Sequence, residues 1–152
     1  MLLVDFILRE ARQEEFPAIR AIIREAHINP LDLDWRRFVI AVNSEGEIIG
    51  CGQVKPHSGG IRELASIAVI PKYRGRGIAR AIIAHLLAEN TPPLYLTCRS
   101  GLEPFYLKFG FRPLIYDEMP TYYRRLARLA SVMMHFRRPG EHLSVMKLEI
   151  FP

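Results

Sequence analysis

Apolar residues follow two rhythms along the chain, short runs typical of strands and wider spacings typical of helices. Runs rich in branched and aromatic residues predict strands at 6–10, 38–42, 48–55, 61–70, 93–98, 111–117 and 143–150. Proline or glycine punctuates most of these runs, as at Pro71 and in NTPP at 90–93. The residues at 38–55 read as a hairpin around the turn NSEGE.

Four segments carry the helical spacing instead: 13–26, the stretch after the glycines near 75, 102–110 and 120–136. Each stripe of apolar residues predicts one buried helix face. For the first, second and last of these segments the stripes are Phe16, Ile19, Ile22, Ile23 and Ala26; Ala79, Ile82, Ile83, Leu86 and Leu87; and Tyr122, Leu126, Leu129, Met133 and Phe136.

The resulting order is β-α-β-β-β-α-β-α-β, followed by an extra helix and a closing strand. This order predicts an α+β fold, with a central mixed sheet of about six to seven strands and helices on both of its faces. No internal repeat or linker divides the 152 residues, so a single domain over 1–152 is expected.

Composition narrows the class of protein. Apolar residues make up 49% and charged residues 24% of the chain, which is a globular mixture. No apolar run reaches the roughly 20 residues of a membrane span, and Asp5 and Arg9 interrupt the first segment, so we expect a cytoplasmic protein without a membrane partner. Cys51 and Cys98 lack metal or disulfide spacing and are expected to be buried thiols.

The formal net charge of +5 indicates an anionic partner. Nucleic acid is disfavoured because aromatic residues are not interleaved with the basic ones and no helix-turn-helix signal appears. A phosphorylated cofactor fits the same charge.

The segment PKYRGRGIAR at 71–80 offers a place for such a cofactor. A strand, a glycine-containing loop and a helix start together form an anion site, because the first helical turn leaves N–H groups unpaired. The alternative interpretation is a flexible loop with a solvated basic face. Two better-known glycine loops are excluded, since no G-x-x-x-x-G-K-[ST] occurs and Arg80 stands where the dinucleotide fingerprint needs a small residue.

RGRGIA at 74–79 resembles the Q/R-x-x-G-x-G/A acetyl-CoA loop of the GNAT superfamily of N-acetyltransferases, and EPFYLKFGFRPL at 103–114 resembles the second signature of that family. The order of the predicted elements is similar to the family's over nearly the whole chain. Only the 17 residues at 120–136 are unusual, because many members join their last two strands by a short loop.

The resemblance implies acetyl-CoA as cosubstrate and no metal. It assigns the pantetheine arm to the backbone of one strand and the diphosphate to the glycine loop. The implied cofactor-binding residues are Ile67, Ala68 and Val69, and then Arg74, Gly75, Arg76, Gly77, Ile78, Ala79 and Arg80.

For catalysis, the resemblance makes Tyr106 the acid that protonates the leaving thiolate, and Glu63 the general base. His57 or a water molecule stays open as the base, and Glu63 also reads as an exposed strand-end carboxylate near Arg62. One departure concerns Arg99, which stands where many relatives place an asparagine that contacts the cofactor arm. Arg99 or Ser100 is expected to replace that contact.

The acceptor is expected to be a small-molecule amine, with a protein N-terminus or lysine as the alternative. Arginines at 124, 125, 128, 137 and 138 lie in a stretch without acidic residues, which favours an acceptor that carries a carboxylate. A solvated basic face is the simpler interpretation of these arginines. A module that senses acetyl-CoA without catalysis, and a homodimer, also stay open.

Overall fold

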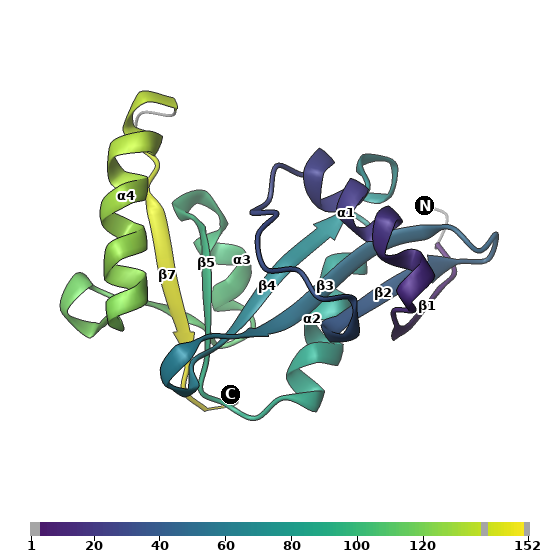
Figure 1. Ribbon diagram of the computed structural model, residues 1–152, viewed down its shortest axis with the longest axis horizontal. Helices are drawn as coiled ribbons and strands as arrows, with labels where there is room; N and C mark the ends of the chain where they lie inside the picture. The colour runs from purple at the N-terminus through teal and green to yellow at the C-terminus, as the bar shows by residue number, and fades with distance from the viewer. Residues whose placement is uncertain (1–3, 138–139, 151–152) are drawn as a thin grey trace. The chain divides into compact units, whose positions relative to one another are not determined.

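The computed structural model describes residues 4–137 and 140–150, with the side chains of 133–137 left out, and follows the predicted order of elements (Figure 1). The strands and helices are β1 Phe6–Glu10, α1 Phe16–Glu25, β2 Phe38–Asn43, β3 Ile48–Pro56, β4 Arg62–Val69, α2 Ile78–Glu89, β5 Leu94–Arg99, α3 Glu103–Leu107, β6 Arg112–Pro113, α4 Thr121–Arg137 and β7 Leu143–Leu148.

Among the described residues the strands form one seven-stranded sheet in the order β1-β2-β3-β4-β5-β7-β6. β4 and β5 pair in parallel, whereas β1 with β2, β2 with β3, β5 with β7 and β6 with β7 pair antiparallel. The predicted α+β fold with a mixed sheet and an extra helix before the last strand is therefore confirmed.

Contacts divide the chain into two compact units, which are described one at a time. The first unit consists of Met1–Pro56 and Leu64–Thr91, and the second of His57–Glu63 and Pro92–Pro152. The expected single domain stays a prediction.

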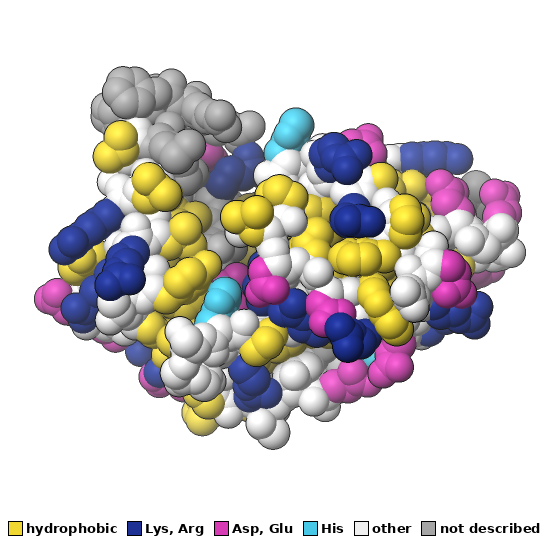
Figure 2. Space-filling model, in the orientation of Figure 1, with side chains coloured by type: hydrophobic (Ala, Val, Ile, Leu, Met, Phe, Trp, Pro, Cys, Tyr) yellow, Lys and Arg dark blue, Asp and Glu magenta, His cyan; other side chains and the backbone are white. Residues whose placement is uncertain are grey.

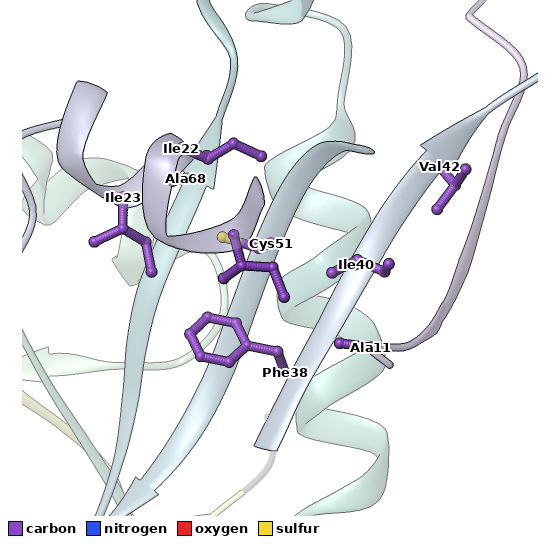
Figure 3. Close-up of a cluster of buried hydrophobic side chains, with 9 residues drawn as sticks. Ala11, Ile22, Ile23, Phe38, Ile40, Val42, Cys51 and Ala68 are labelled. Atoms are coloured by element: carbon purple, nitrogen blue, oxygen red, sulfur yellow. The ribbon is translucent and has the colours of Figure 1, made fainter. Parts of the chain in front are cut away.

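In the first unit, α1 and α2 cover opposite faces of β2 and β3 (Figure 1). Alternate residues of these strands face α1, because successive side chains in a strand point to opposite sides. Figure 3 shows them gathered beneath the helix. This core consists of Ala11, Ile19, Ile22, Ile23, Phe38, Ile40, Val42, Cys51 and Ala68.

The face toward α2 contains two glycines of β3. A methyl group added to Gly52 would lie 2.6 Å from Ile67 Cδ1 and 2.7 Å from Ile82 Cγ2, and one added to Gly50 would lie 3.1 Å from Ile78 Cγ2. Real Cβ atoms essentially never lie within 3.0 Å of such neighbours. The absence of side chains on this face therefore lets α2 approach the sheet closely.

In the second unit, β7 pairs with β5 over six residue pairs, from Leu94 with Leu148 to Arg99 with Leu143. The helix α4 packs along β7 (Figure 1). A small core of Leu114, Tyr123 and Val145 fills the space between them, with Tyr95 and Leu126 partly buried against it.

Two predicted details are wrong. The strand expected at 111–117 is only Arg112–Pro113, because proline offers no N–H to a ladder and the Ile115 N–H is bonded to Glu118 Oε1 at 3.1 Å. The stripe expected to bury α4 is also out of phase, since Tyr122 is 40% and Leu129 61% exposed, while Tyr123 is fully buried.

Leu126 of that stripe is partly buried against the core, and the remaining two members, Met133 and Phe136, lie outside the residues whose side chains are described. Cys51 and Cys98 are buried free thiols, as predicted. Within the described ranges, no helix combines the length and the apolarity that crossing a membrane requires.

Candidate active site

The glycine turn of the first unit leads from β4 into α2. A short 3-10 turn, Pro71–Tyr73, precedes it, and Gly75 and Gly77 have φ angles of 77° and 81°. These left-handed conformations are strained for residues with a Cβ, which explains the two glycines at these positions. Open space surrounds both, because nothing lies within 4 Å of a Cβ built on either residue.

The amino end of α2 opens directly from this turn. Gly77 is its N-cap, and the first intrahelical bond runs from the Ala81 N–H to the Gly77 carbonyl at 3.0 Å. The N–H groups of Ile78, Ala79 and Arg80 therefore have no partner within the helix. The first turn contains no acidic residue, so the helix dipole and these amides favour an anion.

The basic side chains of the turn are partly held by the protein itself. Arg74 Nε donates to the Val69 carbonyl at 3.1 Å, and the Arg76 guanidinium lies 5.5 Å from the Tyr73 ring centroid. Arg80 is exposed. The Val69 carbonyl, expected to hold the cofactor arm, is thus already engaged by Arg74.

Sequence reasoning missed how this turn is anchored. The Tyr73 hydroxyl accepts a hydrogen bond from Asn43 Nδ2 at 3.1 Å, across 30 residues of sequence. Asn43 is buried at the end of β2, where its side-chain oxygen also accepts from the Glu45 and Glu47 amides. Nothing in the sequence pairs these two residues.

The strand before the turn is irregular at Ser66, which has a φ of 59° inside β4. A buried hydrogen bond holds it, because Gln53 Nε2 donates to Ser66 Oγ at 2.8 Å. The predicted arm-binding residues Ile67, Ala68 and Val69 follow directly. The left-handed Ser66 thus marks a local irregularity within the continuous strand β4, immediately before these residues.

In the second unit, a carboxylate, an imidazole and a phenol meet at the start of β4. Glu63 Oε1 lies 3.1 Å from His57 Nε2 and accepts a hydrogen bond of 2.9 Å from the Tyr123 hydroxyl. Glu63 is 8% exposed, so its interpretation as an ordinary exposed strand-end carboxylate is wrong. The two candidates for the general base, Glu63 and His57, are direct partners.

Aromatic rings surround this pair. The His57 ring stacks on Tyr122 at 4.5 Å, and Tyr123 stacks on Tyr95 at 5.4 Å between centroids. Burial, and then the Glu63 carboxylate, raise the pKa of Tyr123 well above its usual range, so this hydroxyl stays protonated. We refer to His57, Glu63, Tyr95, Tyr122 and Tyr123 as the Glu63 cluster.

Tyr106 lies on α3, half-buried, with its ring edge against Phe105 at 5.0 Å and Phe111 at 6.3 Å. Its hydroxyl makes no hydrogen bond to the part of the chain that the structure describes. Burial, with a smaller contribution from Cys98, raises the pKa of Tyr106 to about 12. The phenol is therefore neutral at physiological pH and has a proton to donate.

The residues expected to replace the missing asparagine differ in their contacts. Ser100 Oγ accepts from the His142 N–H at 3.2 Å, and the Ser100 N–H donates to the His142 carbonyl at 2.9 Å. Arg99 is exposed at the end of β5. Among the described residues, no group of three or more His, Cys, Asp or Glu side chains is arranged to hold a metal ion.

Comparison with known proteins connects these features to a family. A family model described as the acetyltransferase (GNAT) domain matches residues 34–113, which is 80 of 152 residues and more than half of the chain. The matched segment includes the glycine turn, Glu63 and Tyr106. No curated protein matches the chain significantly.

Several solved structures share the fold. The N-acetylglutamate synthase from Neisseria gonorrhoeae, complexed with coenzyme A and N-acetyl-glutamate, is 21% identical with a TM-score of 0.68; the match covers 97% of this chain and 36% of that one. The chain thus spans about a third of the length of this synthase.

Two other similar structures have about the same length as this chain. Rv2747 from Mycobacterium tuberculosis, in complex with CoA and NLQ, is 21% identical over 95% of this chain and 99% of that one, with a TM-score of 0.67. The ribosomal-protein-S18-alanine N-acetyltransferase from Escherichia coli is 19% identical over 97% and 96%, with a TM-score of 0.68. At these sequence identities, the similarity shows that the proteins share a fold.

Proposed function

Because the chain belongs to the GNAT acetyltransferase family, we propose that it transfers the acetyl group of acetyl-CoA to a primary amine of a small molecule. The observation that carries this proposal is the amino end of α2, where free amides and a glycine turn face open space. Such a site suits a diphosphate, which is the charged group of coenzyme A. The CoA named in two of the similar structures supports the same cosubstrate.

The residues present fit this cosubstrate. The amides of Ile78, Ala79 and Arg80 would hold the diphosphate, with the exposed Arg80 and Arg76 side chains supplying positive charge. Gly75 and Gly77 would let its oxygens approach the backbone. Ile67 and Ala68 would hold the pantetheine arm by their backbone, as an added strand.

The reaction joins the amine nitrogen to the acetyl carbonyl carbon and breaks the carbon–sulfur bond. The amine loses one proton, which passes to Glu63 or through it to His57. The leaving thiolate takes the proton of the Tyr106 hydroxyl, which solvent later restores. The products are an N-acetyl amine and coenzyme A, and an acceptor that arrives as an ammonium ion releases one further proton to solvent.

Basic residues of α4 support an acceptor that carries a carboxylate. In Figure 2, Lys and Arg side chains lie beside hydrophobic ones over this helix. Arg125 and Arg128 are exposed, whereas Arg124 is engaged by the Tyr116 and Asp117 carbonyls at 3.2 and 2.8 Å. Arg137 and Arg138 lie outside the residues whose side chains are described.

A protein amine is the second candidate within the same chemistry, and the S18-alanine enzyme among the similar structures favours keeping it. A module that binds acetyl-CoA without catalysis is the alternative of another class. The Tyr106 hydroxyl favours catalysis, because a protonated phenol without a hydrogen-bond partner in the described part of the chain can donate its proton to a substrate.

Two measurements test the proposal. Calorimetry should detect acetyl-CoA binding to the parent, and Gly77→Glu should weaken it at least about tenfold, because a carboxylate would repel the diphosphate. Gly46→Glu is the matched control, since Gly46 has a φ of 83° and open surroundings but lies in the β2–β3 turn. Equal binding by all three proteins would reject the diphosphate site.

The second measurement is coenzyme A release across a panel of amino acids, polyamines, aminoglycosides and short peptides. We expect turnover with an acceptor that bears a carboxylate. Turnover only with polyamines would remove the carboxylate preference, and turnover only with peptides would favour the second candidate. Binding of acetyl-CoA without release in any mixture would favour the sensing module.

A further inference from the structure

The helix α4, which precedes the last strand, brings two consecutive tyrosines to the Glu63 cluster. Tyr122 stacks on the His57 ring, and Tyr123 donates to the Glu63 carboxylate. Two adjacent residues of one helical turn thus contact both candidates for the general base, His57 and Glu63. A helix that served only to cover β7 would not need this polar contact.

The geometry at Glu63 fixes the direction of the hydrogen bond. One oxygen, Oε1, lies 2.9 Å from the Tyr123 hydroxyl and 3.1 Å from His57 Nε2. The phenol is the donor, because an ionised carboxylate can only accept. A charge-assisted bond of this kind restrains the rotation of the carboxylate.

The surroundings of Tyr123 keep its hydroxyl in place. The side chain is fully buried, packs with Leu114 and Val145, and stacks on the ring of Tyr95. Any turn of the phenol away from Glu63 would break this packing. The hydroxyl that donates to Glu63 is thus carried by a ring whose position is fixed by its packing.

We propose that Tyr123, from the helix inserted before the last strand, is a positioning residue that orients the Glu63 carboxylate to accept the proton of the attacking amine. The inference rests on the proposed function, and it gives the inserted helix a role in the reaction. Tyr123 acts through Glu63 and does not touch the substrate itself.

The expected pH effect follows from the groups around Glu63. They are His57 from the preceding turn, Tyr122 and Tyr123 from α4, and Tyr95 from β5, with Lys147 of β7 lying 5.5 Å from the Tyr95 ring centroid. Loss of the Tyr123 hydroxyl removes a donor that favours the ionised carboxylate. The acid limb of the kcat/KM profile should then move to higher pH.

The experiment compares Tyr123→Phe with the control Tyr116→Phe, which removes a hydroxyl from an exposed ring outside the Glu63 cluster. Tyr123→Phe should lower kcat/KM about 3- to 30-fold below neutral pH and move the acid limb of the profile to higher pH. Tyr116→Phe should keep the parent profile. Acetyl-CoA binding should stay the same in both.

A double-mutant cycle separates positioning from packing. If Tyr123 acts through Glu63, Tyr123→Phe should change kcat/KM less than about twofold in the Glu63→Gln background, because coupled residues are not additive. Fully multiplicative effects, an unshifted acid limb, or loss of folding in Tyr123→Phe would overturn the inference alone. A parent that turns over no amine would overturn the proposed function, and this inference with it.

Discussion

Replacing Tyr106 by phenylalanine should raise stability slightly and lower activity strongly. The hydroxyl makes no hydrogen bond to the described part of the chain, whereas the ring contacts to Phe105 and Phe111 survive in phenylalanine. A fully buried unsatisfied polar group costs about 1–3 kcal/mol. Tyr106 is only half-buried, so we expect a gain of at most about 1 kcal/mol in the free energy of unfolding.

The expected catalytic loss follows from the proposed role of the Tyr106 hydroxyl as the acid. Its pKa of about 12 keeps the proton in place throughout the neutral range. Without it, the thiolate must take its proton from water, and kcat should fall about 10- to 1000-fold, with acetyl-CoA binding little changed. That fall corresponds to about 1.4 to 4 kcal/mol in the activation barrier.

The assay combines thermal unfolding, calorimetry with acetyl-CoA and coenzyme A release at saturating acceptor. A melting temperature equal to or up to about 4 °C above that of the parent is expected, and Tyr116→Phe, which changes an exposed ring on the segment after β6, serves as the control. An unchanged kcat in Tyr106→Phe would refute the acid assignment. A marked loss of stability would refute the structural reasoning about the hydroxyl.

Two other predictions concern titrating groups. Glu63→Gln keeps an acceptor for Tyr123 but removes the base, so kcat/KM should fall about 100-fold or more and lose its acid limb; a pH profile identical to that of the parent would move the base to His57 or water. Burial raises the pKa of Cys51 to about 12 and that of Cys98 to about 11, from usual values near 9. The unfolded thiols therefore ionise first, and the stabilisation present below pH 9 should be lost as pH rises toward 11–12, by about 2 kcal/mol for Cys51 at pH 10.5. Denaturant unfolding at pH 8 and 10.5 measures this loss, which should shrink in Cys51→Ala.

The glycine turn was predictable because its chemistry is local. The conformations of Gly75 and Gly77, the unpaired amides and the start of α2 all depend on residues within ten positions of one another. The sequence therefore indicated this site together with its ligand class.

The Glu63 cluster was only half predictable. Glu63 and His57 lie six residues apart and were both named, but the Tyr123 hydroxyl comes from 60 residues further along the chain. The spacing of α4 fits a stripe through Tyr122 about as well as one through Tyr123, because Leu126 lies four residues after the first and three after the second. The buried carboxylate and the Tyr95 ring decide between them, and neither can be read from the helix itself.

The two glycines of β3 affect the position of the proposed anion site. Gly50 and Gly52 admit Ile78 and Ile82 against the strand, and Ile78 is the first residue of α2. The distance between α2 and the sheet therefore sets the position of the amides at the N-terminus of this helix. Two glycines more than 20 positions before the turn thus influence where the backbone amides of the proposed diphosphate site lie.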